Sequence, residues 1–140
     1  KAFLRLEKPQ WVYEVRSGRA YGLTDTVELE LKGLDCLLFA CLPAEAKPVT
    51  VEAPKAVKRG GTLHVKAQSS AQVLRFEMMP PDGYSEERFE PMVFRLLDTK
   101  DGAAECDFAI AWDEPYDGYT LIVTDVATGR SVSQKIKVTD

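Results

Sequence analysis

Residues 105–125 have the sequence ECDFAIAWDEPYDGYTLIVTD, and this stretch decides the fold class. Apolar side chains occupy every second position in its first half, and the same alternation returns after a turn at Asp117-Gly118. The alternating residues are Cys106, Phe108, Ile110, Trp112, Tyr119, Leu121 and Val123. A period of two places such side chains on one face of a strand. The stretch therefore predicts two β-strands, each with one buried face, joined by a loop.

The same alternation recurs along most of the chain, and turns that contain glycine separate the runs. No window of a dozen residues has helical periodicity. The chain is therefore predicted to be all-β, with a seven-stranded antiparallel sandwich of the immunoglobulin type after residue 48. The predicted strands of this sandwich are Val49–Ala53, Thr62–Gln68, Gln72–Met79, Met92–Leu97, Glu105–Trp112, Tyr119–Asp125 and Ser131–Val138.

Residues 1–42 are predicted to be a small β segment, separated from residues 49–140 by a linker at 43–48 that contains Pro43 and Pro48. Its predicted strands are Phe3–Leu6, Trp11–Arg16, Thr26–Leu31 and Leu37–Cys41. So few strands bury too little area to fold alone, so the segment is expected to be the end of a preceding domain. A first residue other than methionine agrees with a piece cut from a longer protein. Trp11 and Tyr13, in phase on one strand face, are expected to mark the contact with a neighbouring domain.

Composition excludes several classes of partner. The chain has 18 basic and 22 acidic residues, a net charge of −4, and its basic residues are scattered. Nucleic acid or an anionic membrane would require a concentrated basic face, so neither is expected as a partner. No run of about 18 apolar residues is present to cross a bilayer. The three cysteines, Cys36, Cys41 and Cys106, have the spacing of neither a disulfide framework nor a zinc site.

The first segment, through residues 11–18, 21–31 and 37–40, resembles the small β domain that follows the barrel in many large bacterial glycoside hydrolase-like proteins. The pattern is Trp-Val-Tyr-Glu-Val-Arg-Ser-Gly, then a strand of acids and leucines, then an apolar strand that ends near proline. The second segment resembles the immunoglobulin-like module that can follow it. The matching residues are 51–54, 60–61, 73–77, 81–83, 118–119 and 124–129. In that family the catalytic carboxylates lie on the barrel, so the resemblance implies an accessory region without catalytic residues.

Aromatic residues in loops are candidates for carbohydrate binding. Tyr84, Trp112 and Tyr116 lie in or beside loops and could converge at one end of the sandwich as a stacking platform for sugar rings. Trp112 also continues the inward phase of Phe108, which favours a place in the core, and Tyr116 could simply cap the core's end. Whether Trp112 is buried or exposed discriminates between the two interpretations.

The loop before Gly118 also carries the acids Asp113, Glu114 and Asp117. A glycosidase needs two carboxyl groups about 5–10 Å apart, and the same oxygens would suit Ca²⁺, the one cofactor considered. The simpler interpretation is a solvated turn. Motifs for a nucleophile, a zinc protease or a phosphate loop are missing from the sequence, so the chain is expected not to be an enzyme.

The sequence therefore predicts a non-catalytic accessory, structural or interaction module of a larger, exported carbohydrate-active protein, located outside the cell or in the periplasm. Its expected partner is a neighbouring domain of that protein. The alternative is a carbohydrate-binding module that uses Tyr84, Trp112 and Tyr116.

Overall fold

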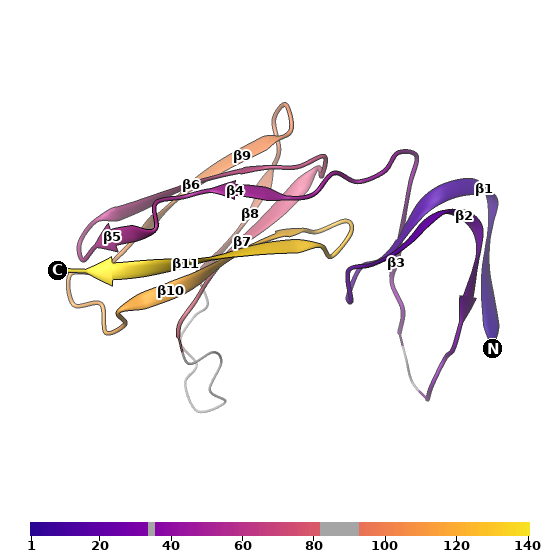
Figure 1. Cartoon of the computed structure of the whole chain (residues 1–140), viewed down its shortest axis with the longest axis horizontal. Coiled ribbons are helices and arrows are strands. Elements are labelled where there is room, and N and C mark those ends of the chain that lie inside the picture. Colours follow the sequence, from indigo (N-terminus) through magenta and orange to yellow (C-terminus); the bar gives the residue numbers. More distant parts are fainter. Residues whose placement is uncertain (34–35, 82–92) are drawn as a thin grey trace.

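The computed structural model describes residues 1–33, 36–81 and 93–140, and these residues form strands, turns and loops with no helix (Figure 1). None of them therefore forms a helix that could cross a membrane. The strands are β1 Ala2–Glu14, β2 Arg19–Leu29, β3 Phe39–Leu42, β4 Thr50–Glu52, β5 Ala56–Lys58, β6 Thr62–Gln68, β7 Val73–Met79, β8 Val93–Asp98, β9 Ala103–Ala109, β10 Gly118–Asp125 and β11 Ser131–Thr139. The predicted all-β class is confirmed.

Strands β4 to β11 make two sheets that face each other. One sheet has the order β5-β11-β10-β7-β8 and the other has the order β4-β6-β9. Every pairing in the two sheets is antiparallel except that of β5 with β11. This is an immunoglobulin-like sandwich in which β8 joins the sheet of β7 and β10 at its edge.

The first strand of the sandwich is divided between the two sheets. The alternation predicts a single strand at Val49–Ala53, but β4 covers only Thr50–Glu52 and pairs with β6, whereas β5 pairs with β11 in the opposite sheet. Pro54 lies between the two pieces and has no N–H to donate to a sheet. The chain therefore changes sheets at this proline, and β5 is a strand that the alternation does not predict.

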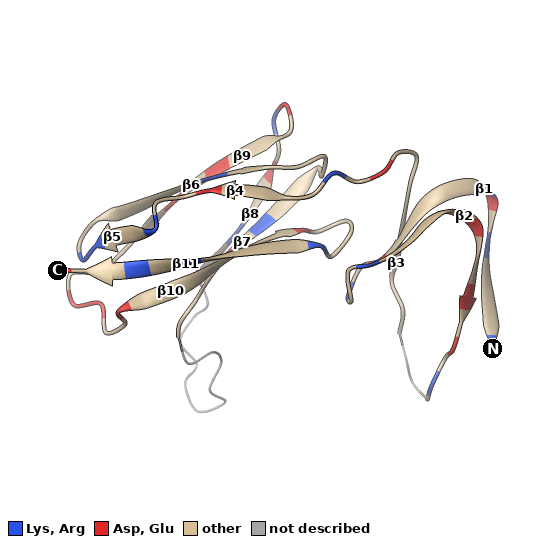
Figure 2. Cartoon of the chain, viewed as in Figure 1, with Lys and Arg blue, Asp and Glu red and all other residues tan. Residues whose placement is uncertain are grey.

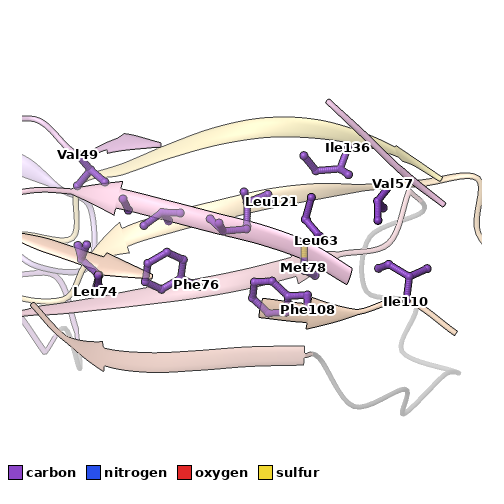
Figure 3. Close-up of a cluster of buried hydrophobic side chains, with 14 of the residues drawn as sticks. Val49, Val57, Leu63, Leu74, Phe76, Met78, Phe108, Ile110, Leu121 and Ile136 are labelled. Atoms are coloured by element: carbon purple, nitrogen blue, oxygen red, sulfur yellow. The ribbon is translucent and has the colours of Figure 1, made fainter. Parts of the chain in front are cut away.

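The core lies between the two sheets and follows the predicted alternation (Figure 3). Leu63, Phe76 and Leu121 are completely buried and come from three different strands, β6, β7 and β10. Burying such side chains contributes roughly 1.5–3 kcal/mol each. Cys106 packs against this cluster, and burial raises the pKa of its thiol to about 11, which keeps it protonated and unreactive.

Trp112 does not belong to the core, contrary to the inward phase inferred from its spacing. Strand β9 ends at Ala109, and beyond it the chain bonds to the turn between β5 and β6: the N–H of Ile110 donates to the Gly61 carbonyl (2.9 Å) and that of Gly60 to the Ala111 carbonyl (3.1 Å). The regular pleat stops there, and the alternation has no structural meaning beyond it. Trp112 is 82% exposed.

Strands β1 to β3 form a separate sheet of order β2-β1-β3. β1 is one continuous strand, although the sequence predicts two, Phe3–Leu6 and Trp11–Arg16, and the irregularity between them takes the form of a register shift between Arg5 and Gln10. The buried hydrophobic residues of this sheet are Val12, Tyr13 and Val27. Figure 1 shows the sheet beside one end of the sandwich, while the C-terminus lies at the other end.

Candidate functional site

Most of the residues predicted to form a site lie in one loop, between β9 and β10, at the end of the sandwich that holds the C-terminus (Figure 1). The Trp112 indole lies against Gly60 in the neighbouring turn, so closely that a Cβ atom on this glycine would overlap the Cε2 atom of the ring. Gly60 has a φ of +71°, which glycine adopts without strain. An exposed but supported indole is a surface on which the apolar face of a ligand can stack. We call it the Trp112 platform.

Arg59 holds the loop beneath this platform. Its Nε donates to the Glu114 carbonyl oxygen (3.1 Å), its Nη2 to Asp117 Oδ1 (2.9 Å) and its Nη1 to Asp140 Oδ1 (2.6 Å). The hydrogen bond with Asp117, together with the charge of Asp140, raises the pKa of Arg59. No sequence signal marks this residue as an anchor, because Asp117 and Asp140 are 58 and 81 positions away.

The three acids of the loop have separate surroundings. Asp117 is engaged with Arg59, Glu114 Oε1 accepts a long hydrogen bond from the Tyr116 N–H (3.4 Å), and Asp113 is exposed. Within residues 1–33, 36–81 and 93–140, no three His, Cys, Asp or Glu side chains are grouped as metal ligands would be. The geometry therefore gives no support to a calcium site at Asp113, Glu114 and Asp117.

Of the other two predicted aromatic residues, the structure describes Tyr116. Tyr116 is half-buried and its ring meets Tyr119 edge-on, with 5.8 Å between centroids and 75° between the planes. Tyr84 lies outside the described residues. Within the described part of the chain, the Trp112 platform consists of one indole, and the ring of Tyr116, in the same loop, is turned toward β10.

The second candidate region is the joint between the small sheet and the sandwich. Tyr13, 2% exposed, accepts a hydrogen bond at its hydroxyl from the Ala46 N–H (2.9 Å), and Nη1 of Arg130 donates to the Ala46 carbonyl (3.2 Å). The linker residue Ala46 is itself buried. The predicted linker is therefore bound on one side by the small sheet and on the other by the sandwich.

The turn between β10 and β11 completes this joint. The buried carboxylate of Asp125 accepts hydrogen bonds from Ala127 N (2.8 Å), Thr128 N (3.2 Å) and Thr128 Oγ1 (2.8 Å), which fixes the turn. Gly129, with a φ of +71°, lies directly on the chain of the small sheet: a Cβ atom there would overlap the Val15 carbonyl oxygen. The two backbones touch with no side chain between them.

Glu14 fixes the small sheet's side of the joint. Its buried carboxylate accepts hydrogen bonds from Ser17 N (2.7 Å), Arg16 N (3.2 Å) and Leu38 N (3.5 Å). The side-chain hydrogen bond with Ser17, supported by these backbone bonds, lowers the pKa of Glu14 to about 2 despite its burial. The carboxylate thus holds the β1–β2 turn against the segment before β3.

Beyond this joint, the small sheet leaves large apolar side chains uncovered. Trp11 pairs across the sheet with Leu23 and with Leu42, and directly opposite residues share one face. Trp11 itself is half-buried, whereas Leu23 is 59% exposed. The exposed large hydrophobic residues among residues 1–33 and 36–42 are Phe3, Leu23, Leu31, Leu37 and Leu38. Phe3 and Leu23 lie in β1 and β2, and Leu31, Leu37 and Leu38 lie between β2 and β3. We call these five residues the apolar surface of the small sheet.

The fold and these two regions define an immunoglobulin-like β-sandwich with a tightly joined N-terminal sheet. No family model and no curated protein matches the chain. Two solved structures of the superoxide reductase (neelaredoxin) from Ignicoccus hospitalis are similar to it, each with a TM-score of 0.50. Their identities are 15% and 14%, over 69% and 67% of this chain and 83% and 82% of theirs.

The sulfur carrier protein SoxY from Chlorobium limicola f thiosulfatophilum matches 66% of this chain and 79% of its own, with 19% identity and a TM-score of 0.42. At such identities the superoxide reductase shows that the fold is shared, and no more. The shared fold nevertheless contradicts the prediction that the chain is not an enzyme. That prediction rests on missing motifs in a β-sandwich, and a β fold of this kind also occurs in an enzyme.

Proposed function

We propose that this chain is an accessory module of a larger, exported carbohydrate-active protein, and that its small sheet packs against a neighbouring domain of that protein. The observation that carries the proposal is the apolar surface of the small sheet, five large side chains left uncovered in strands β1 and β2 and in the segment between β2 and β3, next to a joint that is fixed to the sandwich. The resemblance of residues 11–40 to the sheet that follows a glycoside hydrolase-like barrel supports the same arrangement.

Burial of this surface by another domain is energetically favourable. A three-stranded sheet of about forty residues has too little core to be stable by itself, and here its buried hydrophobic residues are only Val12, Tyr13 and Val27 among those that the structure describes. Covering a half-exposed leucine or phenylalanine side chain contributes about 1 kcal/mol. Five such side chains would add several kcal/mol to the stability of the pair of domains.

The position of the sheet favours a domain of the same polypeptide as the cover. The N-terminus lies at the end of β1 remote from the sandwich (Figure 1), so a domain joined there would lie beside Phe3, the second residue of β1. The rigid joint at Ala46 would then hold the sandwich at a set angle to that domain.

Hydrogen exchange tests this function. Amides of Phe3–Leu31 are expected to exchange more slowly in the longest natural polypeptide that contains this chain than in residues 1–140 alone. The double substitution Phe3→Ser and Leu23→Ser should remove most of that protection. Phe94→Ser, at an exposed phenylalanine of β8, is the matched control and should leave it unchanged. Equal exchange rates in the long and short proteins would contradict the proposal.

A second candidate function is carbohydrate binding, favoured by the 82% exposure of the supported Trp112 indole. On a panel of insoluble polysaccharides, Trp112→Ala should lower retention at least tenfold, because the stacking surface is lost. Phe94→Ala removes an exposed aromatic ring elsewhere and should have no effect. Retention that is equal in both variants and in the parent chain would exclude this candidate.

A further inference from the structure

A groove of about 560 Å³ lies at the C-terminal end of the sandwich, beside the loop of the Trp112 platform. Gly118, Tyr119 and Thr120 of β10 lie along it, and Lys55, Lys135 and Lys137 also line it. We call it the lysine groove. The sequence pattern does not predict it, because the lysines come from two separate segments of the chain.

Backbone contacts define the shape of the groove. The N–H of Lys137 donates to the Lys55 carbonyl (2.9 Å), and the N–H of Val138 donates to the Asp117 carbonyl (2.8 Å). Gly118 approaches the opposite strand so closely that a Cβ atom there would be 2.7 Å from the Ile136 carbonyl oxygen. The groove is therefore held by main-chain hydrogen bonds rather than by mobile side chains.

The groove is basic although the chain is acidic overall. Among the residues that the structure describes, Lys55, Lys135 and Lys137 take part in no ion pair. The one acid that lines the groove, within the described part of the chain, is Asp117, and it is bound by Arg59. Figure 2 shows basic segments of β11 and beside β5 at this end of the sandwich. Three lysine charges thus lie together along one groove.

We infer that the lysine groove binds the acidic groups of an anionic polysaccharide. The inference rests on the carbohydrate-binding function proposed for the Trp112 platform and names its ligand class. Asp117 lines the groove and bonds Arg59, which also bonds the Glu114 carbonyl in the loop that carries Trp112, so the groove and the platform are joined by one set of hydrogen bonds. Three lysines in a groove suit intermittent carboxylate or sulfate groups better than nucleic acid, which needs a longer basic face.

Two pairs of ligands, each with one sugar backbone in a charged and a neutral form, provide the test. Binding is measured by affinity electrophoresis on polygalacturonate against its methyl ester, and on dextran sulfate against dextran. The parent chain should bind a charged member at least fivefold more tightly than its neutral partner, and less tightly as salt rises. Preference for polygalacturonate identifies carboxylate as the group that is bound, and preference for dextran sulfate identifies sulfate.

Two double variants distinguish binding in the lysine groove from a nonspecific effect of the net charge of the chain. Lys135→Gln with Lys137→Gln should weaken binding to the charged ligand roughly fivefold, the loss expected for two exposed ion pairs. Lys8→Gln with Lys47→Gln makes the same change in net charge on the small sheet and the linker, and it should have little effect. Equal losses in the two double variants, or equal binding to charged and neutral ligands, would overturn the inference. If Trp112→Ala has no effect while Lys135→Gln with Lys137→Gln weakens binding, the function proposed for the Trp112 platform is wrong and the inference for the lysine groove is still supported.

Discussion

At the scale of single residues, Gly60 and Trp112 are coupled. The indole is exposed to solvent, yet it has a defined position because Gly60 presents bare backbone to its face. The positive φ of Gly60 shapes the turn that brings this backbone to the ring. A glycine is required here for two reasons, conformation and space.

Gly60→Ala is expected to displace the indole and to increase its motion, because the new Cβ atom would overlap the ring. In a Trp11→Phe background, the fluorescence anisotropy of Trp112 should fall. The positive φ adds a destabilisation of about 1–2 kcal/mol. Gly22→Ala is a matched control, because Gly22 has a φ of +81° but open space within 4 Å of the position that a Cβ atom would take. It should lose similar stability without any change in anisotropy.

Glu14 makes stability depend on pH in the acid range. The pKa of its carboxyl group is about 2 in the folded chain and about 4.5 when unperturbed, so the folded state favours the charged form. This contribution is complete above about pH 4.5 and is lost as the pH falls toward 2. Urea unfolding between about pH 2 and 6 should show stability that rises with pH over this window. Glu14→Gln should flatten the rise, whereas Glu7→Gln, at an exposed residue of the same strand, should leave it intact.

Single residues also show where prediction from sequence ends. Alternation places Phe108 correctly in the core but carries the same phase on to Trp112, since a period says nothing about where pairing stops. In the sequence, Arg59 is one of the scattered basic residues and has no marked partner. Its role depends on Asp117 and Asp140, which only the folded chain brings to it.

At the scale of elements, the joint between the small sheet and the sandwich depends on one hydroxyl group. Tyr13→Phe removes the acceptor of the buried Ala46 N–H, and an unsatisfied buried donor costs about 1–3 kcal/mol. Urea unfolding should register this loss, and amide exchange at Ala46 should become faster. Tyr21→Phe, in the same sheet, serves as control and should change stability by less than about 0.5 kcal/mol. A Tyr13→Phe variant as stable as its parent would show that water replaces the hydroxyl.

Strands of the sandwich are predictable where apolar residues alternate over several positions, whereas the two longest strands, β1 and β2, are predicted only in part. β6, β7, β10 and β11 each contain three or more alternating apolar positions, and their predicted ranges agree closely with the structure. β5 has three residues, too few to establish any period, and its partner lies at the far end of the chain. The two strands predicted at Phe3–Leu6 and Trp11–Arg16 are one strand, β1, with a register shift between Arg5 and Gln10.

At the scale of the whole molecule, the core of the sandwich contributes most of the stability that single substitutions can remove. Phe76 is completely buried between the sheets, and its replacement by alanine is expected to cost about 3–5 kcal/mol. Phe94→Ala, on the outer face of the neighbouring strand β8, should cost about 1 kcal/mol or less. Thermal unfolding of the two variants measures the difference. Similar losses would mean that the outer face is covered in solution.

The pairing of β5 with β11 has a mechanical consequence. The two strands are parallel, with Ala56 opposite Lys137 and Lys58 opposite Thr139, so the chain enters β5 at one end of the pair and leaves β11 at the other. A tension applied between the small sheet and the C-terminus would therefore load these hydrogen bonds in shear, all together, rather than open them one at a time. The short strand at the change of sheets would act as a clamp against pulling.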